Sequence, residues 1–104
     1  MIVNLNVRDR LVVISILPAN GKLTEMVEVM DLVKKIKFSE EERNEINYNE
    51  AEGKIQWDMS KDLGKDFDLN IDQIKIIQNS IKKLDDEGKI DLNLLDTCLK
   101  FNKL

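Results

Sequence analysis

The most constraining feature of the sequence is a long apolar seam in its last third. Isoleucine or leucine recurs at spacings of three and four residues from Ile71 to Leu84, which is the period of one face of an α-helix. Asn70 precedes the seam as an N-cap residue, and Gly88 follows it as a stop signal. The sequence therefore predicts a long helix between Asn70 and Gly88 that buries one face against the rest of the chain.

Two helices are predicted before this seam, in the first third of the chain. Asn6, followed by Asp9 three residues later, is a typical cap for a helix that ends at Pro18. Thr24 is the expected cap of a second helix. Its inner stripe is expected to consist of Val27, Met30 and Val33, with Leu23 as a further candidate.

Two shorter helices complete the helical prediction. Ser39 and Glu42 have the spacing of a capping box and predict a short third helix with an acidic first turn. Asp91 is the expected cap of a last helix, which places Cys98 on its apolar face. A cysteine in such a place is more often a buried structural thiol than a reactive one.

The residues between the third and fourth helices change to the period of a β-strand. Tyr48 and Trp57 each belong to a short alternating run, and a loop over 49–53 separates the two runs, which indicates a β-hairpin. Phe67 and Leu69 alternate with aspartates and would add a third short strand. The predicted fold is mostly α (α+β): about five helices in a single domain over 1–104, with the hairpin inserted between helices 3 and 4.

The composition excludes the commonest catalytic and metal-binding arrangements. The chain has no histidine and one cysteine, which removes the usual general base, the usual metal ligand and every Cys-His or Ser-His pair. The four glycines are scattered, so no phosphate-binding loop is present. We therefore expect no enzyme activity, no cofactor and no metal.

Two carboxylate patterns remain and both favour a structural interpretation. The run from Asp66 to Asp72 resembles the start of a calcium loop, but Ile71 and Ile77 stand where such a loop needs glycine and glutamate. We expect a strand edge followed by the Asn70 cap there. Asp58 and Asp62 have helical spacing and could face each other.

The charge distribution indicates the kind of partner. The net charge is −4, and residues 39–72 contain eleven acidic against four basic side chains. No cluster of lysine or arginine is present, so nucleic-acid binding is not expected. The longest apolar run, 11–17, is too short to span a membrane. With no signal-peptide pattern and one cysteine, the expected location is the cytoplasm.

The predicted hairpin carries the best candidates for a contact surface. Tyr48 and Trp57 are the only tyrosine and tryptophan, and aromatic residues dominate binding hot spots. Glu50, Glu52 and Asp58 form an acidic rim beside them. These five residues are the predicted partner-binding site, although an aromatic on an alternating hairpin more often packs onto the core beneath it.

Several segments together resemble a group of small uncharacterised proteins common in bacteriophage and prophage genomes. The resemblance spans nearly the whole chain and lies in VRDRL at 7–11, ILP at 16–18, FSEEE at 38–42, IQWD at 55–58 and IKKLDDEGKI at 81–90. It implies a bacterial host and carries over no catalytic residue. Small acidic phage proteins of this kind often bind a host or defence protein or sequester a small ligand.

Three functional hypotheses follow. The first is a non-enzymatic protein that binds a host protein, as an inhibitor of a bacterial defence system would. The second is a homo-oligomer that sequesters a nucleotide-like small molecule. The third is a winged-helix-like regulator or an acidic mimic of nucleic acid, because three helices followed by a hairpin is the element order of that fold.

Overall fold

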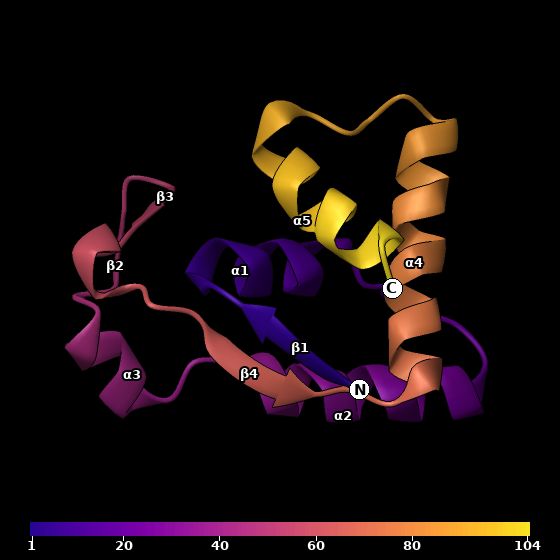
Figure 1. Cartoon of the computed structure of the whole chain (residues 1–104), viewed down its shortest axis with the longest axis horizontal. Helices are drawn as coiled ribbons and strands as arrows, with labels where there is room; N and C mark the ends of the chain where they lie inside the picture. The colour runs from indigo at the N-terminus through magenta and orange to yellow at the C-terminus, as the bar shows by residue number, and fades with distance from the viewer.

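The structure is a computed structural model that describes residues 1–104 (Figure 1). Five α-helices, a short 3-10 helix and two small antiparallel sheets make up the chain. In chain order the elements are β1 (Ile2–Leu5), α1 (Val7–Ile16), α2 (Leu23–Ile36), α3 (Glu40–Glu45), β2 (Asn49–Ala51), β3 (Lys54–Gln56), the 3-10 helix η1 (Met59–Lys61), β4 (Lys65–Asp68), α4 (Ile71–Asp86) and α5 (Leu92–Asn102).

The predicted fold class is confirmed: five helices are present, and the hairpin of β2 and β3 lies between α3 and α4. The predicted caps explain where the helices begin. The side chains of Asn6 and Asn70 each accept a hydrogen bond, at 2.8 Å, from the backbone N–H three residues on, and in both cases the third residue bonds back. Asp91 caps α5, and Gly88 follows α4 with a positive φ of 66°.

A two-stranded sheet that the sequence did not predict joins the first residues to the middle of the chain. β1 pairs with β4 in antiparallel register, with Val3 opposite Phe67 and Leu5 opposite Lys65. Val3, Leu5 and Phe67 are buried. The strand expected around Phe67 therefore exists, but its neighbour is β1 and not the hairpin, because β1 offers alternate apolar residues for the core face.

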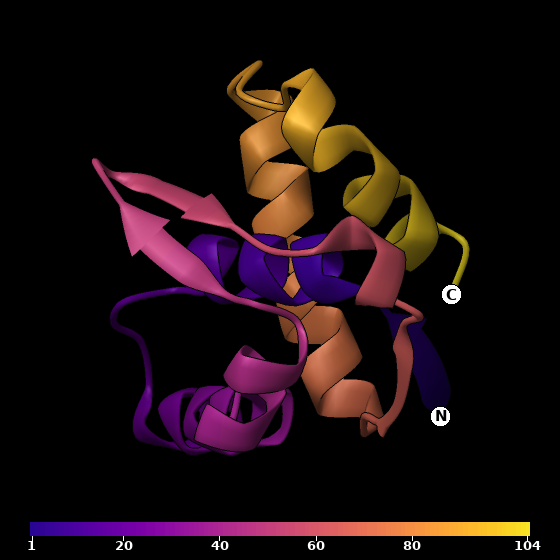
Figure 2. The ribbon, with the colours of Figure 1, turned by 90° about the vertical axis from the view of Figure 1, so that its left-hand side faces the viewer.

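One core of twelve buried residues draws on both ends of the chain and on all the long helices. α4 crosses both α2 and α5, and α1 lies between them (Figures 1 and 2). Ile74, Ile77 and Ile81 of the predicted seam are buried in this core, whereas Ile71 at the start of α4 is exposed.

The expected inner stripe of α2 is wrong except for Val33, which is half-buried. Leu23, Val27 and Met30 are exposed, and the buried face consists of Val29, Leu32 and Ile36. The helix also begins two residues earlier than expected, at Leu23, with Lys22 rather than Thr24 in the cap position. Apolar residues occupy two faces of this helix, so periodicity alone could not decide which face meets the core.

Buried polar side chains connect the helices at two places. Asp9 of α1 accepts hydrogen bonds from Lys100 and, at 2.7 Å, from Thr97, both in α5. Gln73 of α4 donates to Asp31 of α2 at 2.7 Å. Because buried polar groups are stable only when hydrogen-bonded, these contacts fix how the helices pack as well as how tightly.

The two faces of α2 give a direct test of the packing. We expect Leu32→Ala to lower the free energy of unfolding by about 2–4 kcal/mol, because Leu32 is fully buried and the change leaves a cavity. Val27→Ala should change it by less than about 0.5 kcal/mol, because Val27 is exposed. Urea denaturation of both variants measures the difference, and the reverse order would contradict this orientation of α2.

Candidate functional site

The hairpin turns through two residues with left-handed backbone, Glu52 (φ 54°) and Gly53 (φ 73°). Positive φ at both central residues is typical of the tight two-residue turn that suits twisted strands. The observed turn is thus shorter than the predicted 49–53 loop. All six residues of β2 and β3 are exposed, and the hairpin extends away from the helices (Figure 2).

A groove of about 540 Å³ lies between the hairpin and α1. Leu11, Val12 and Ile14 of α1 line it together with Phe38, which follows α2. Its remaining lining residues are Tyr48, Glu50 and Ile55 from the hairpin region and Ser15, Lys37 and Arg43. Glu50 and Ile55 are direct cross-strand neighbours, so both are carried into the groove by the same face of the hairpin.

Tyr48 joins the groove to the hairpin. Its ring lies 5.6 Å from the ring of Phe38, and the guanidinium of Arg43 lies 5.0 Å over it. Its hydroxyl donates a 2.8 Å hydrogen bond to Glu50. Burial, and then the neighbouring Glu50 carboxylate, raise the pKa of Tyr48 above its usual value of 10.0, so the phenol stays neutral and remains a hydrogen-bond donor at pH 7.

The groove is less acidic than the composition of the 39–72 segment suggests. Lys37 and Arg43 line it, and neither forms an ion pair within the chain. Glu50 is the one carboxylate among its lining residues. The groove therefore combines an apolar floor with charges of both signs, an arrangement suited to a polypeptide segment.

A second hollow, of about 340 Å³, lies against Trp57 and Met59. Ile55 lines this hollow as well as the groove, and Arg8 of α1 is another of its lining residues. Trp57 is partly buried, and its indole N–H is buried without a hydrogen-bond partner. Ile55 thus contributes apolar surface both to the groove and to this second hollow.

The structure places the five predicted site residues in four different settings. Tyr48 and Glu50 line the groove, and Trp57 lines the neighbouring hollow. Glu52 forms the tip of the turn. Asp58 caps η1 through Ser60, and these hydrogen bonds lower the pKa of Asp58 below its usual value of 3.8, so its carboxylate already has a structural role.

Sequence reasoning missed the groove residues that lie outside the hairpin. Leu11 and Ile14 of α1 are half-buried and line the groove, but the predicted site contained no residue of this helix. No sequence pattern indicated that Lys37 or Arg43 would belong to a contact surface. The one available clue was the breadth of the apolar face of α1, which exceeds what a single buried stripe needs.

A buried arginine beneath the groove holds its floor in place. Arg10 of α1 donates to the carbonyl oxygens of Ile36 (2.8 Å) and Lys37 (2.9 Å), where α2 ends. It also makes a two-pronged pair with Glu42 of α3, at 2.7 and 3.1 Å. Its guanidinium lies 3.9 Å from the ring centre of Phe38, so one side chain fixes α1, the end of α2, α3 and a residue of the groove.

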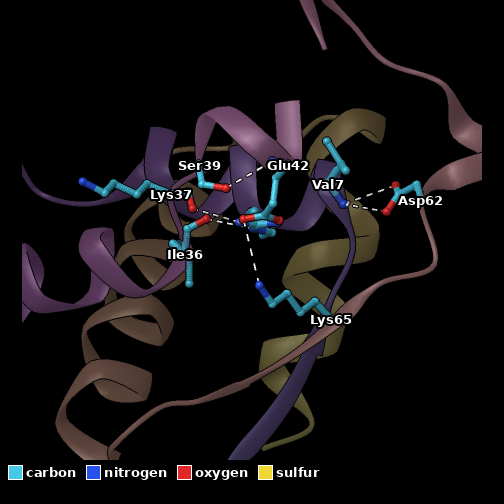
Figure 3. Close-up of polar contacts among 8 residues, drawn as sticks. Val7, Ile36, Lys37, Ser39, Glu42, Asp62 and Lys65 are labelled. Atoms are coloured by element: carbon cyan, nitrogen blue, oxygen red, sulfur yellow. Dashed lines mark hydrogen bonds and ion pairs between the residues drawn. The ribbon is translucent and has the colours of Figure 1, made fainter. Parts of the chain in front are cut away.

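Glu42 is shared between α3 and this network (Figure 3). Its backbone N–H donates to the Ser39 hydroxyl at 3.1 Å, which confirms the serine half of the predicted capping box. Its carboxylate turns to Arg10, and Lys65 of β4 lies 4.0 Å away. The hydrogen bond from Arg10 is the main reason why the pKa of Glu42 lies below its usual value of 4.5.

Two of the carboxylates singled out in the sequence, Asp62 and Asp66, have structural partners of their own. Asp62 accepts hydrogen bonds from the backbone N–H of Val7 at 3.1 and 3.2 Å, at the start of α1, and so does not pair with Asp58. Asp66 lies on β4 and accepts from Asn4 at 3.0 Å. No group of three or more histidine, cysteine, aspartate or glutamate side chains lies close enough to hold a metal ion.

The thiol of Cys98 is buried in the core, as predicted. Burial raises the pKa of Cys98 above its usual value of 9.0, which disfavours the reactive thiolate at neutral pH. None of the helices has the length and apolar character needed to cross a membrane.

Comparisons with protein-family models, with curated proteins and with solved structures find no match to this chain.

The Arg10–Glu42 pair predicts a defined loss of stability in acid. Because Arg10 lowers the pKa of Glu42 in the folded state, its contribution is complete above about pH 4.5 and is lost as the pH falls through the folded-state pKa. We expect Glu42→Gln to cost roughly 1–2 kcal/mol at neutral pH. The difference in unfolding free energy between wild type and variant should shrink below about pH 4.5.

Urea denaturation at a series of pH values measures this difference. Glu41→Gln is the matched control, since Glu41 occupies the same helical turn but is exposed and makes no hydrogen bond through its side chain. If the difference in unfolding free energy between wild type and Glu42→Gln stays constant with pH, the Arg10–Glu42 pair does not cause the loss of stability in acid.

Proposed function

We propose that the chain is a non-enzymatic, phage-type protein that binds a host protein through the groove between its hairpin and α1, as an inhibitor of a bacterial defence system would. The groove itself is the observation that carries this proposal. It has an apolar floor and a volume of about 540 Å³, and two of its lining residues, Glu50 and Ile55, come from a hairpin that contributes none of the twelve core residues.

The composition of the groove favours a polypeptide partner over a small molecule. Ligand pockets enclose most of their ligand, whereas this groove is open along the exposed hairpin. β2 and β3 pair only with each other, so each strand has a free edge whose backbone groups are available to an added strand. A partner segment that inserts an apolar side chain beside Ile55 would bury it against Leu11 and Ile14.

Charges around the groove would orient such a segment. Glu50 lies on the hairpin side and Lys37 and Arg43 on the other side, with Glu52 at the exposed tip. Complementary charges across an interface mainly raise the association rate and fix the register. We infer that the partner segment carries a basic side chain toward the hairpin and an acidic one toward α3.

The two other hypotheses receive less support from the geometry. A reading helix in the major groove needs a basic exposed face, whereas α3 has six residues, begins with three glutamates and uses Glu42 to bind Arg10. A nucleotide cage needs clustered cations or a glycine-rich loop for the phosphates, and no feature of the structure supplies one.

The acidic residues of the hairpin provide the first test. A tagged chain is used to recover its partner from bacterial lysate, and the affinity of that purified partner is then measured by calorimetry. We expect Glu50→Lys with Glu52→Lys to weaken binding by roughly ten-fold or more at low salt, because two attractive charges become repulsive. Asp86→Lys with Glu87→Lys, at the far end of α4, is the control with the same change in net charge.

The apolar floor provides the second test, with a matched pair of isoleucines. Ile55 is 41% exposed in the groove and Ile71 is 65% exposed on α4. We expect Ile55→Ser to weaken binding of the same partner at least ten-fold, since it removes an apolar contact, and Ile71→Ser to leave the affinity unchanged. Equal affinities of both variants would exclude the groove as the contact surface.

A further inference from the structure

The outer face of α5 is apolar and has no covering element. Leu92 is 86% exposed and Leu99 is 47% exposed, and Leu95 lies between them on the same face. The opposite face of the helix, with Thr97, Cys98 and Phe101, already fills the core. The leucines recur at spacings of three and four, which is the pattern of a helix that packs against another helix.

A hollow of about 480 Å³ opens beside this leucine stripe, between α4 and α5. Leu95, Leu99 and Ile90 line it, together with Cys98 at the core side. Polar and charged residues, among them Lys82 and Asp85, line the rest of this hollow. An exposed stripe beside a hollow suits a packed interface, because protruding side chains from one surface need space on the other.

Two unpaired charges flank the stripe on one side. Asp96 and Lys103 are seven residues apart, which places them about two helical turns apart on the same line of the helix. Both are exposed, and neither forms a hydrogen bond or an ion pair through its side chain within the chain. The stripe thus has a carboxylate near the start of the helix and an ammonium group near its end.

We propose that this face binds a second copy of the chain, with the two α5 helices antiparallel about a two-fold axis next to Leu99. In an antiparallel pair the same flank of each helix meets the same flank of its partner, in opposite direction. Asp96 of each copy then lies beside Lys103 of the other. The two-fold axis produces this ion pair twice and packs Leu99 against its counterpart. Because the axis lies in the second half of α5, Leu92 lies outside the overlap of the two helices.

The charge pattern selects α5 over the other exposed helical face. The outer stripe of α2 continues from Leu23, Val27 and Met30 into Lys34. The carboxylate beside it, Asp31, already accepts a hydrogen bond from Gln73 and pairs with Lys35, so it is not free to pair across an interface. Self-pairing of α2 would therefore bury lysines without compensation. The α2 stripe consequently serves as the control surface, equally apolar but not self-complementary.

The size of the α5 face determines the expected strength. With the axis beside Leu99, only the second half of each eleven-residue helix overlaps its partner, so the contact lies at the small end of specific interfaces. We therefore expect a reversible dimer with a dissociation constant in the micromolar range. It is independent of the hairpin groove, with which it shares no residue.

A charge-swap cycle tests the proposal without disturbing the core. Sedimentation equilibrium at low salt, over low to high micromolar concentrations, measures the dimer constant of each full-length protein. Asp96→Lys and Lys103→Asp should each weaken the dimer roughly ten-fold, because each turns both symmetric attractions into repulsions. The double variant Asp96→Lys with Lys103→Asp should return the constant to within about two-fold of wild type, since both ion pairs re-form in exchanged order.

A second comparison tests the apolar part of the same contact. Leu99→Ser should weaken the dimer at least ten-fold, whereas Met30→Ser on α2 should leave it unchanged; melting curves confirm that both variants are folded. A wild-type chain that stays monomeric throughout this concentration range would overturn the proposal. Single charge variants without effect, or a double variant as weak as either single one, would also overturn it.

Discussion

The burial of a single guanidinium, that of Arg10, is the constraint on which the hairpin side of the molecule depends. A buried cation is stable only when its donors are satisfied and its charge is compensated. Arg10 meets this requirement with the two carbonyl groups at the end of α2, the carboxylate of Glu42 and the ring of Phe38. These partners come from two segments, residues 36–38 and α3, so the end of α2 and the position of α3 follow from one charge. Phe38 is also part of the groove, and the groove therefore inherits its geometry from the buried pair.

Local signals in the sequence were sufficient to place the starts of four of the five helices. The caps at Asn6, Ser39, Asn70 and Asp91 involve residues only two or three positions apart, and such contacts can be inferred from the order of residue types alone. The hairpin was predictable for the same reason, since its turn and its alternating residues are neighbours in the chain. Even the unreactive setting of Cys98 followed from its place on an apolar helical face.

Contacts between distant segments could not be inferred in this way. Nothing near Val3 indicates that its strand pairs with the strand of Phe67, because this pairing depends on how the rest of the chain packs around the two strands. α2 carries apolar residues on two faces, and only the packing against α4 decides that Leu32 is buried and Val27 is not. Arginine is a residue type that is usually exposed, and the burial of Arg10 depends on partners 26 to 32 residues away in the chain. The groove depends on all of these contacts between distant segments. Tyr48 and Glu50 were therefore predicted as site residues, whereas the residues of its floor were not.

The two proposed contact surfaces have a consequence when they are considered together. The groove is formed by residues 11–55 and the α5 face by residues 90–103, and they share no side chain. A dimer through α5 would use none of the residues that line the groove and would hold two grooves in one particle. For a partner that is itself an oligomer, the second groove would bind at a high effective concentration, so that two weak contacts give tight overall binding without any additional interface. A small chain with a core of twelve residues can in this way reach an affinity that a single open groove of this size would not supply.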